Sequence, residues 1–404
     1  MNCRFCKTDL NHVFVDLVNS PASNSFLTKE QLDEPETFYP LKIYVCDKCK
    51  LVQIDEYKKS DDIFDKDYAY FSSYSTSWLA HSKSYVEKMT DKLVLGASSL
   101  VTEIASNDGY LLQYFKENQI PCIGVEPTSS TANVAKEKGI EVIEDFFGTK
   151  LASSLNKSDL ILGNNVLAHV PDINDFVQGL KIALKDNGTV TMEFPHLLNI
   201  IKENQFDTIY HEHFSYLSFY TVKQVFEKQG FKLYDVEKLV THGGSLRIYA
   251  THIENHNIDI SASVSNLLNE EKEFGLFELD IYKNFQEKAN KVKYDLLGFL
   301  LQAKKEKKKV IAYGAAAKGN TLLNYAGIKN DLIEFVVDKS PHKQGKYLPA
   351  SHIPIVAEVE ITKSKPDYIL ILPWNIKDEV VEQLDYVRVW GGQFVIAVPM
   401  LKVD

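Results

Sequence analysis

A strand–turn–helix–strand pattern near the middle of the chain constrains its fold more than any other feature. Residues 100–105, Leu-Val-Thr-Glu-Ile-Ala, are typical of a buried parallel strand, and the turn 106–109, Ser-Asn-Asp-Gly, leads into a helix. A second strand at residues 122–126 ends in an acid. Two later strands, at residues 159–163 and 188–193, also end in polar groups. This order predicts an α/β domain with a parallel sheet, which binds its ligand at the carboxyl ends of the strands.

The composition of the first turn indicates which ligand this sheet binds. It has one glycine, Gly109, where a dinucleotide-binding G-x-G-x-x-G turn has three. A pyrophosphate needs those glycines because it approaches the backbone closely, whereas a nucleoside without phosphate does not. Glu126 stands where such sheets place a carboxylate against an adenosine ribose, and Glu103, Asn107 and Asp108 suit a cationic methionine group. We therefore expect S-adenosylmethionine rather than NAD. The residues expected to form its pocket are Glu103, Ala105, Asn107, Asp108, Gly109, Glu126, Pro127 and Asn164.

The cysteines indicate a second kind of site. Cys3 and Cys6 form one C-x-x-C pair, and Cys46 and Cys49 form another. Two such pairs about forty residues apart can supply four thiolates to a tetrahedral zinc ion, which leaves no open position and is therefore structural. A redox dithiol would need one pair, and unligated thiols are the remaining alternative. Cys122 lies in an apolar run and is interpreted as a core residue.

The size and charge of the chain limit its class. Its 404 residues predict two or three domains, and its formal charge of −10 argues against broad nucleic-acid binding. No window approaches the roughly 18 uninterrupted apolar residues that a membrane span requires. We expect a cytoplasmic protein without a nucleic-acid or membrane partner, and the sequence is silent on its oligomeric state.

The stretch 210–216, Tyr-His-Glu-His-Phe-Ser-Tyr, is the candidate for acid–base chemistry. It is too polar for a core strand, and its histidines and carboxylate are costly to bury without partners. We interpret it as the location of a general base. A metal site is the alternative, but Glu212 lies between His211 and His213 and would face away from both in a strand. His169 lies near the carboxyl edge of the predicted sheet and is either structural or functional.

A second α/β domain is predicted in the last third of the chain. Residues 255–309 form a long helical region, and apolar strands follow at residues 310–313, 333–338, 368–372 and 394–398.

Two glycine-containing turns are candidates for binding a phosphate or diphosphate. Residues 243–247, Gly-Gly-Ser-Leu-Arg, offer backbone N–H groups and a guanidinium, with a surface ion pair as the alternative for Arg247. Residues 314–321, Gly-Ala-Ala-Ala-Lys-Gly-Asn-Thr, match neither the dinucleotide fingerprint nor a P-loop, yet a helix N-terminus with Lys318 can hold an anion. Asn320 belongs to the same turn, and NAD binding there is an open alternative.

Four stretches together carry a resemblance to a known family. They are the two cysteine pairs, residues 103–112 with 124–127, residues 210–213, and residues 313–319. In this combination the chain resembles the zinc-containing, S-adenosylmethionine-dependent sugar C-methyltransferases that act on nucleotide-linked 4-keto-deoxyhexoses.

The resemblance implies three consecutive domains, of which the first binds zinc and the other two are α/β domains. These are a small N-terminal zinc module (1–75), a Rossmann-like class I methyltransferase domain that binds S-adenosylmethionine (76–254), and a C-terminal α/β domain (255–404) that closes over the nucleotide sugar.

The resemblance also implies roles for individual residues. His213 matches the family's base, and Tyr210, Glu212 and His169 match residues around the sugar. Tyr70 falls in the family's tyrosine–serine stretch and is our candidate for substrate binding, together with Arg247, Lys318 and Asn320. The nucleotide is expected to be dTDP or GDP.

The expected reaction is removal of the proton α to the C4 ketone, followed by methylation, most simply at C3. Carbon needs a base for this step, because it is a poor nucleophile until deprotonated. Methylation at C5 is a close alternative. An NAD(P)-dependent sugar ketoreductase and a non-catalytic zinc-containing adaptor are alternatives from other classes.

Overall fold

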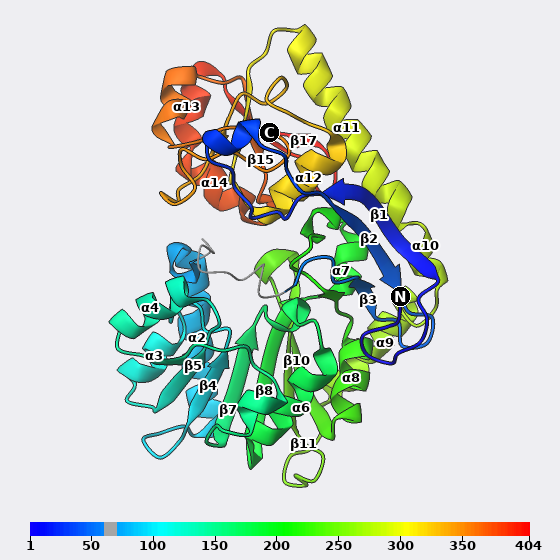
Figure 1. Cartoon of the computed structure of the whole chain (residues 1–404), viewed down its shortest axis with the longest axis vertical. Coiled ribbons are helices and arrows are strands. Elements are labelled where there is room, and N and C mark those ends of the chain that lie inside the picture. Colours follow the sequence, from blue (N-terminus) through cyan, green and yellow to red (C-terminus); the bar gives the residue numbers. More distant parts are fainter. Residues whose placement is uncertain (60–70) are drawn as a thin grey trace. The chain divides into compact units, whose positions relative to one another are not determined.

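The structure is a computed structural model that describes residues 1–59 and 71–404 (Figure 1). By its internal contacts the chain divides into two compact units. The first contains residues 1–11, 45–197 and 214–279, and the second contains residues 12–44, 198–213 and 280–404. Neither unit is one continuous stretch, whereas the sequence predicted three consecutive domains.

The first unit contains a seven-stranded sheet with the order β10-β11-β8-β7-β4-β5-β6. Five of its strands are parallel, and the hairpin of β10 and β11 runs antiparallel along β8. The strands are β4 (Val101–Ile104), β5 (Cys122–Val125), β6 (Glu141–Ile143), β7 (Ser158–Asn164), β8 (Leu184–Pro195), β10 (Phe231–Leu239) and β11 (Ser245–His252). The sheet confirms the predicted α/β domain, and β4, β5, β7 and β8 lie within a few residues of the predicted positions.

Helices cover this sheet because each has one apolar face. They are α2 (Thr76–Leu93), α3 (Leu112–Glu117), α4 (Ser129–Glu137), α5 (Thr149–Ala152), α6 (Ile173–Ala183), α8 (Phe219–Lys228) and α9 (Ala262–Phe274). In α2 the buried residues Trp78, Tyr85 and Met89 recur at helical spacing and enter the core that also contains Phe115. The Ser75 hydroxyl caps this helix by accepting from the Trp78 N–H.

The zinc-binding segments also belong to the first unit. Cys3 and Cys46 each begin a turn that closes on a lysine with positive φ, 64° at Lys7 and 60° at Lys50. In each turn the lysine N–H donates to the cysteine carbonyl, at 2.9 and 3.0 Å. The following strand β3 (Val52–Ile54) pairs antiparallel with β9 (Ser215–Tyr216).

The second unit contains a six-stranded sheet with the order β14-β13-β12-β15-β16-β17, which is parallel except for β17. Its strands are β12 (Val310–Tyr313), β13 (Val336–Val337), β14 (Ile355–Val356), β15 (Tyr368–Ile371), β16 (Gln393–Ile396) and β17 (Lys402–Val403). Its helices include α7 (Leu197–Lys202, apart from its first residue), α10 (Asp280–Lys283), α11 (Phe285–Lys305), α12 (Ala317–Ala326), α13 (Val359–Ser364) and α14 (Lys377–Gln383). This confirms the predicted second α/β region.

Two early strands complete the second unit. They are β1 (His12–Ser20) and β2 (Tyr39–Val45, apart from its last residue). Phe14 of β1 stacks on Phe285 of α11, with ring centroids 4.5 Å apart. Leu27 and Tyr347 exchange two backbone hydrogen bonds, of 3.0 and 2.9 Å. Residues near the N-terminus are therefore part of the C-terminal core.

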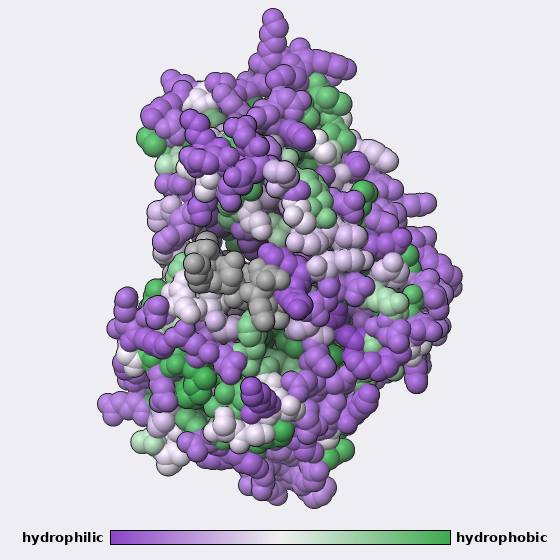
Figure 2. All heavy atoms as spheres, viewed as in Figure 1, coloured by the Kyte–Doolittle hydropathy of each residue, from purple (hydrophilic) through white to green (hydrophobic). Residues whose placement is uncertain are grey.

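The surface is consistent with the charged composition. On the face seen in Figure 2, hydrophilic residues prevail and apolar residues form patches among them. No helix in residues 1–59 and 71–404 combines the length and apolar character that a membrane span needs.

Candidate functional site

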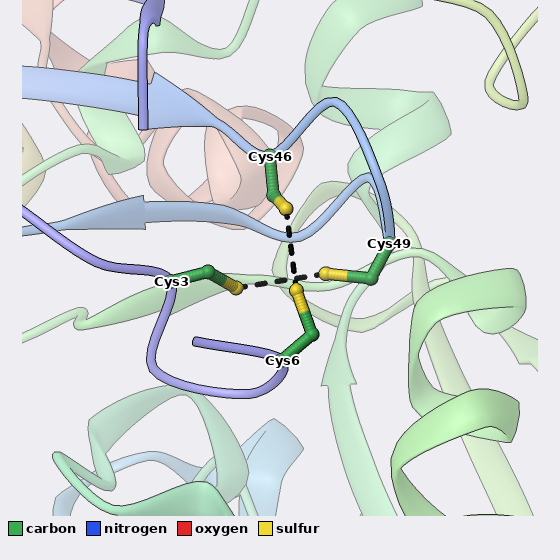
Figure 3. Close-up of side chains that lie close together, drawn as sticks. All are labelled: Cys3, Cys6, Cys46 and Cys49. Carbon is green, nitrogen blue, oxygen red and sulfur yellow. Dashed lines mark hydrogen bonds between the residues drawn. The ribbon is translucent and has the colours of Figure 1, made fainter. Parts of the chain in front are cut away.

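Four cysteine sulfurs converge in the first unit (Figure 3). The Sγ atoms of Cys3 and Cys49 are 3.6 Å apart, those of Cys6 and Cys46 are 3.5 Å apart, and all four lie within 4.8 Å of one another. Sulfurs at about 2.3 Å from a tetrahedral zinc ion are separated by about 3.8 Å, so the cluster has the required size. Zinc binds cysteine as the thiolate, and four cysteines at this spacing can supply four such ligands. With cysteine at every position, the site is structural, as predicted.

Two side chains that the sequence did not single out hold this centre in place. Gln53 Nε2 donates to Cys3 Sγ at 3.2 Å, and its Oε1 accepts from the Arg4 N–H at 2.8 Å. The Arg4 guanidinium donates to the carbonyls of Ile54 and Pro171, at 2.5 and 2.6 Å. Both residues stand next to a cysteine or a strand end, but nothing in the sequence indicates which distant group each one meets.

The residues predicted to bind S-adenosylmethionine lie at the carboxyl ends of β4, β5 and β7. The turn after β4 has positive φ at Ala105, Asn107 and Gly109, and a Cβ on Gly109 would lie 2.4 Å from Ile140. Glu126 braces this turn, because its carboxylate accepts from the Asn107 N–H at 2.9 Å. Pro127 follows directly.

Two acids of the pocket lie deep in the structure. Glu103 has no exposed surface, and burial raises its pKa well above the usual value despite a hydrogen bond from Tyr110 that lowers it. A cation bound beside this carboxyl would restore its charge. Asp108 is 2% exposed and accepts from the Ser73 N–H at 3.2 Å, and Asn107 Oδ1 accepts from the Ser72 N–H at 2.9 Å. Residues 72–73 are thus hydrogen-bonded to the turn that follows β4.

Asn164 supplies a further polar group at the end of β7. It is 8% exposed, and neither its amide nitrogen nor its amide oxygen has a hydrogen-bond partner among the described residues. Because a buried amide normally makes hydrogen bonds, this side chain fits a ligand with both a donor and an acceptor, such as adenosine. The pocket residues therefore fit S-adenosylmethionine.

The predicted base lies in the second unit. His213 is 9% exposed, and its Nδ1 lies 2.8 Å from the carbonyl oxygen of Thr208. A carbonyl only accepts, so Nδ1 carries a proton, and in the neutral ring the electron pair that can accept a proton is on Nε2. The Tyr210 ring lies 4.0 Å from the His213 ring, between centroids. This tautomer suits a base that acts through Nε2.

The neighbours of His213 point elsewhere. Both carboxylate oxygens of Glu212 accept from Asn24 Nδ2, at 2.8 and 2.9 Å. His211 Nε2 lies 3.2 Å from the carbonyl oxygen of Pro40. Among the described residues, the group of side chains placed to hold a metal ion is the cysteine cluster, so the alternative metal site at residues 211–213 does not form.

His169 lies in the first unit, in a short helix after β7, and the Tyr210–His213 stretch lies in the second. Its predicted role therefore stays a prediction. Tyr70 falls outside the described residues, so its role also stays a prediction.

The structure places Arg247 in a buried ion pair. Its guanidinium is 4% exposed and donates to Glu193, with an Nε–Oε1 distance of 2.7 Å, and to Glu237 at 3.2 Å. Glu193 also lies 2.9 Å from His81 Nε2. The guanidinium after the glycine-rich turn is thus part of an internal ion pair, and its predicted role in substrate binding stays a prediction.

The structure likewise places Lys318 and Asn320 in internal contacts. Lys318 Nζ donates to Asn375 Oδ1 at 2.7 Å and lies 4.8 Å from the centre of the Trp374 ring. Asn320 is fully buried and donates to the Ser23 carbonyl at 2.6 Å. Both side chains contact other residues of the protein, and their predicted role in substrate binding stays a prediction.

Sequence reasoning missed one further group near the base. Asp207 is fully buried, accepts from the Trp374 indole N–H at 2.7 Å, and lies beside Thr208. Burial raises its pKa to about 6, while Lys318 and the indole N–H lower it. The polar character of residues 204–216 was a signal, but its partner lies far along the chain.

Comparison with known proteins agrees with this architecture. The chain matches family models described as "Putative zinc binding domain" over residues 3–64, "Methyltransferase domain" over 81–236 and "C-methyltransferase C-terminal domain" over 240–399. It is 31% identical to the C-methyltransferase NovU of Streptomyces niveus over 405 residues, which covers 99% of this chain and 96% of NovU.

Solved structures match part of the chain. Magnesium protoporphyrin IX methyltransferase of Synechocystis PCC 6803 aligns with 43% of this chain and 83% of its own, at 15% identity and a TM-score of 0.35. An S-adenosylmethionine-dependent methyltransferase of Clostridium acetobutylicum aligns with 43% and 92%, at 11% identity and a TM-score of 0.36.

The sheet, its pocket and the family models define an S-adenosylmethionine-dependent methyltransferase. The cysteine cluster adds a structural zinc site. Because the likeness to NovU and the three family models spans nearly the whole chain, the chain belongs to the zinc-binding, S-adenosylmethionine-dependent C-methyltransferases.

Proposed function

We propose that this enzyme methylates carbon C3 of a nucleotide-linked 4-keto-6-deoxyhexose. The observation that carries the proposal is the state of His213, whose Nδ1–H is held by the Thr208 carbonyl so that Nε2 can take a proton. A C-methyltransferase needs such a base, because the acceptor carbon becomes nucleophilic only after deprotonation. The sugar and its dTDP or GDP carrier come from the resemblance of the sequence motifs.

The proposed chemistry has two steps. His213 Nε2 takes the proton from the carbon next to the ketone, and the electron pair moves onto the ketone oxygen as an enolate. The Tyr210 hydroxyl or His169 donates a hydrogen bond to that oxygen and lowers the barrier. S-adenosylmethionine, held by the residues at the carboxyl ends of β4, β5 and β7, would supply an electrophilic methyl on a sulfonium to this carbon. In this step positioning contributes most.

The pocket of the first unit supports the choice of methyl donor. Buried Glu103 and Asp108 suit the cationic methionine end, Glu126 suits the ribose, and Asn164 has unused donors and acceptors for the base.

No observation favours the ketoreductase alternative. In the C-terminal sheet the acid after β13 is Asp338, where a dinucleotide-binding fold would bind the ribose. Its carboxylate accepts from the backbone N–H groups of Ala315 and Ser340, both at 2.8 Å, and lies 3.7 Å from Lys343.

The test is incubation with S-adenosylmethionine labelled in its methyl group and a panel of nucleotide-linked 4-keto-6-deoxyhexoses in heavy water. We expect one methyl group at C3, and deuterium at the same carbon when S-adenosylmethionine is omitted. Methylation at C5 would overturn the regiochemistry and keep the class. If no sugar in the panel gains a methyl group or deuterium, the proposed substrate class is wrong.

A further inference from the structure

The stretch that carries the proposed base is held at three consecutive residues. Thr208 accepts from His213 through its carbonyl at 2.8 Å. The residues on either side, Asp207 and Ile209, are each bound by a side chain from the C-terminal part of the second unit. The Thr208 carbonyl, which fixes the tautomer of His213, therefore lies between two residues that are each held by a hydrogen bond.

The first clamp acts on the carboxylate of Asp207. The indole N–H of Trp374, just after β15, donates to Asp207 Oδ2 at 2.7 Å. Lys318 of α12 lies over the Trp374 ring and favours the charged form of Asp207. A buried carboxylate with a cation nearby and a charge-assisted hydrogen bond is strongly oriented.

The second clamp acts on the backbone of Ile209. The Thr321 hydroxyl, on the buried side of α12, donates to the Ile209 carbonyl at 2.8 Å. Thr321 is 1% exposed, and the other buried residues of α12 hold this helix in place. Two adjacent residues connect this donor to the base: Thr321 binds the carbonyl of Ile209, and His213 binds the carbonyl of Thr208.

We propose that Trp374 and Thr321 are positioning residues that set the tautomer of His213 by clamping the Thr208 carbonyl. The glycine-containing turn before α12, which looks like an anion site in the sequence, then serves to hold the base. Without a fixed acceptor at Nδ1 either ring nitrogen can carry the proton, and the share of molecules with a basic Nε2 falls. This inference rests on the proposed function, because it assigns His213 the role of base.

The first test replaces Trp374 by phenylalanine, which keeps a ring for Lys318 and removes the N–H. Trp390→Phe is the matched control, because Trp390 donates the same group to the Pro366 carbonyl, at 3.0 Å. We expect Trp374→Phe to slow deuterium entry into the keto sugar about tenfold, with KM for S-adenosylmethionine changed less than about twofold. Trp390→Phe is expected to leave both unchanged.

The second test uses the hydroxyl of Thr321. Thr321→Val removes the donor and keeps the shape, whereas Thr321→Ser keeps the donor. The valine variant is expected to slow exchange and the serine variant to restore it. This pair remains informative if Trp374→Phe fails to fold, because it changes a different contact of the same segment.

A direct readout is the ring tautomer of His213, from the nitrogen chemical shifts of protein labelled with 15N-histidine and assigned with His213→Gln. Wild-type protein is expected to show the Nδ1–H form, and Trp374→Phe and Thr321→Val a mixture. Unchanged tautomers in both variants, or an equal effect of Trp390→Phe, would overturn the proposal. If wild-type protein exchanges no sugar proton, the proposed function fails, yet the tautomer still tests the clamp.

Discussion

At the residue scale, the chemistry depends on which nitrogen of His213 carries the proton. The Thr208 carbonyl fixes it on Nδ1, so the side chain is available as a base without any further rearrangement of its ring. With an unperturbed pKa of about 6.5, imidazole is well matched to taking up a proton near neutral pH.

Replacing His213 by alanine should abolish both methyl transfer and deuterium entry, because no base remains at the substrate. S-adenosylmethionine affinity, measured by calorimetry, should change less than about threefold, since its pocket belongs to the other unit. His256→Ala, which removes an exposed histidine, is the control and should leave activity intact. Retained exchange in His213→Ala would exclude it as the base.

Asp207 predicts a pH dependence of stability. Its pKa is raised to about 6 in the folded protein, from 3.8 in the unfolded chain, because it is buried. The folded state then binds more protons between these values, so this group's contribution to stability decreases as pH rises from about 4 to 6. Asp207→Asn keeps an acceptor for Trp374 and should be more stable at pH 7, on the order of 1–3 kcal/mol.

The check for Asp207 is unfolding of wild type and variant at several pH values. The gain should shrink towards pH 4, where the wild-type carboxyl is protonated in both states. A difference that is the same at pH 4 and pH 7 would contradict the assignment.

The residue scale also shows where sequence reasoning reached its limit. Asn164, Glu126 and Gly109 were predictable, because their positions follow from strand ends and turn chemistry. Arg247 was not, because its partner Glu193 is 54 positions away and opposite it only in the β11–β8 register. A glycine-rich turn followed by an arginine indicates that the arginine binds an anion. In this structure the anion that Arg247 binds is the carboxylate of Glu193.

At the scale of the elements, one buried carboxylate joins two helices of the first unit. Glu271 of α9 accepts from the Phe219 and Tyr220 N–H groups at the start of α8, at 2.6 and 2.7 Å, and from His196 Nε2 at 2.6 Å. It thus satisfies N–H groups that a helix start leaves without partners and supplies charge at the positive end of the helix.

Glu271→Ala should therefore lower stability by about 3–5 kcal/mol, because it leaves several buried donors unsatisfied. Thermal unfolding followed by circular dichroism measures the effect. Glu273→Ala, in the same helix but exposed, is the control and should shift the midpoint by less than about 2 °C. Equal shifts in both variants would show that Glu271 does not hold α8.

The zinc module gives a prediction for metal removal. Cys46→Ser should lose the zinc ion and lower the unfolding midpoint, because residues 1–11 and 45–54 have little core of their own. Metal content by mass spectrometry and the unfolding midpoint are the measurements. Cys122→Ser, which changes a cysteine outside the cluster, should keep its zinc. Zinc retained in full by Cys46→Ser would contradict the site.

The elements themselves were largely predictable. The run 310–313 forms β12 at its expected bounds, because a short apolar run directly reflects burial within a sheet. The helical region 255–309 contains a break that was not predicted. Gly275, with φ of 98°, ends α9, and the chain then passes into the second unit at residue 280.

At the scale of the whole molecule, neither unit can be cut out as one segment. The core of the second unit includes Phe14 on Phe285, and Phe206 beside Tyr325 with ring centroids 5.7 Å apart. Sequence patterns did not predict this division. A short strand such as 12–20 can be recognised by its residues, but they do not indicate which sheet it joins.

A fragment of residues 280–404 should therefore fail to fold by itself, since it lacks residues 12–44 and 198–213. We expect low solubility and no cooperative unfolding by circular dichroism. The full chain is the control. A fragment with a sharp unfolding transition would show that residues 12–44 and 198–213 are not required for this domain to fold.

The position of the base in the chain has a consequence for its synthesis. His213 is made before the residues that orient its neighbours, Thr321 and Trp374, because protein is synthesised from the N-terminus. A ribosome that has released residues 1–279 has delivered every strand of the sheet that binds S-adenosylmethionine. In the proposed mechanism, a chain interrupted after residue 279 would therefore contain the residues proposed for the methyl donor and lack the two side chains proposed to orient the base.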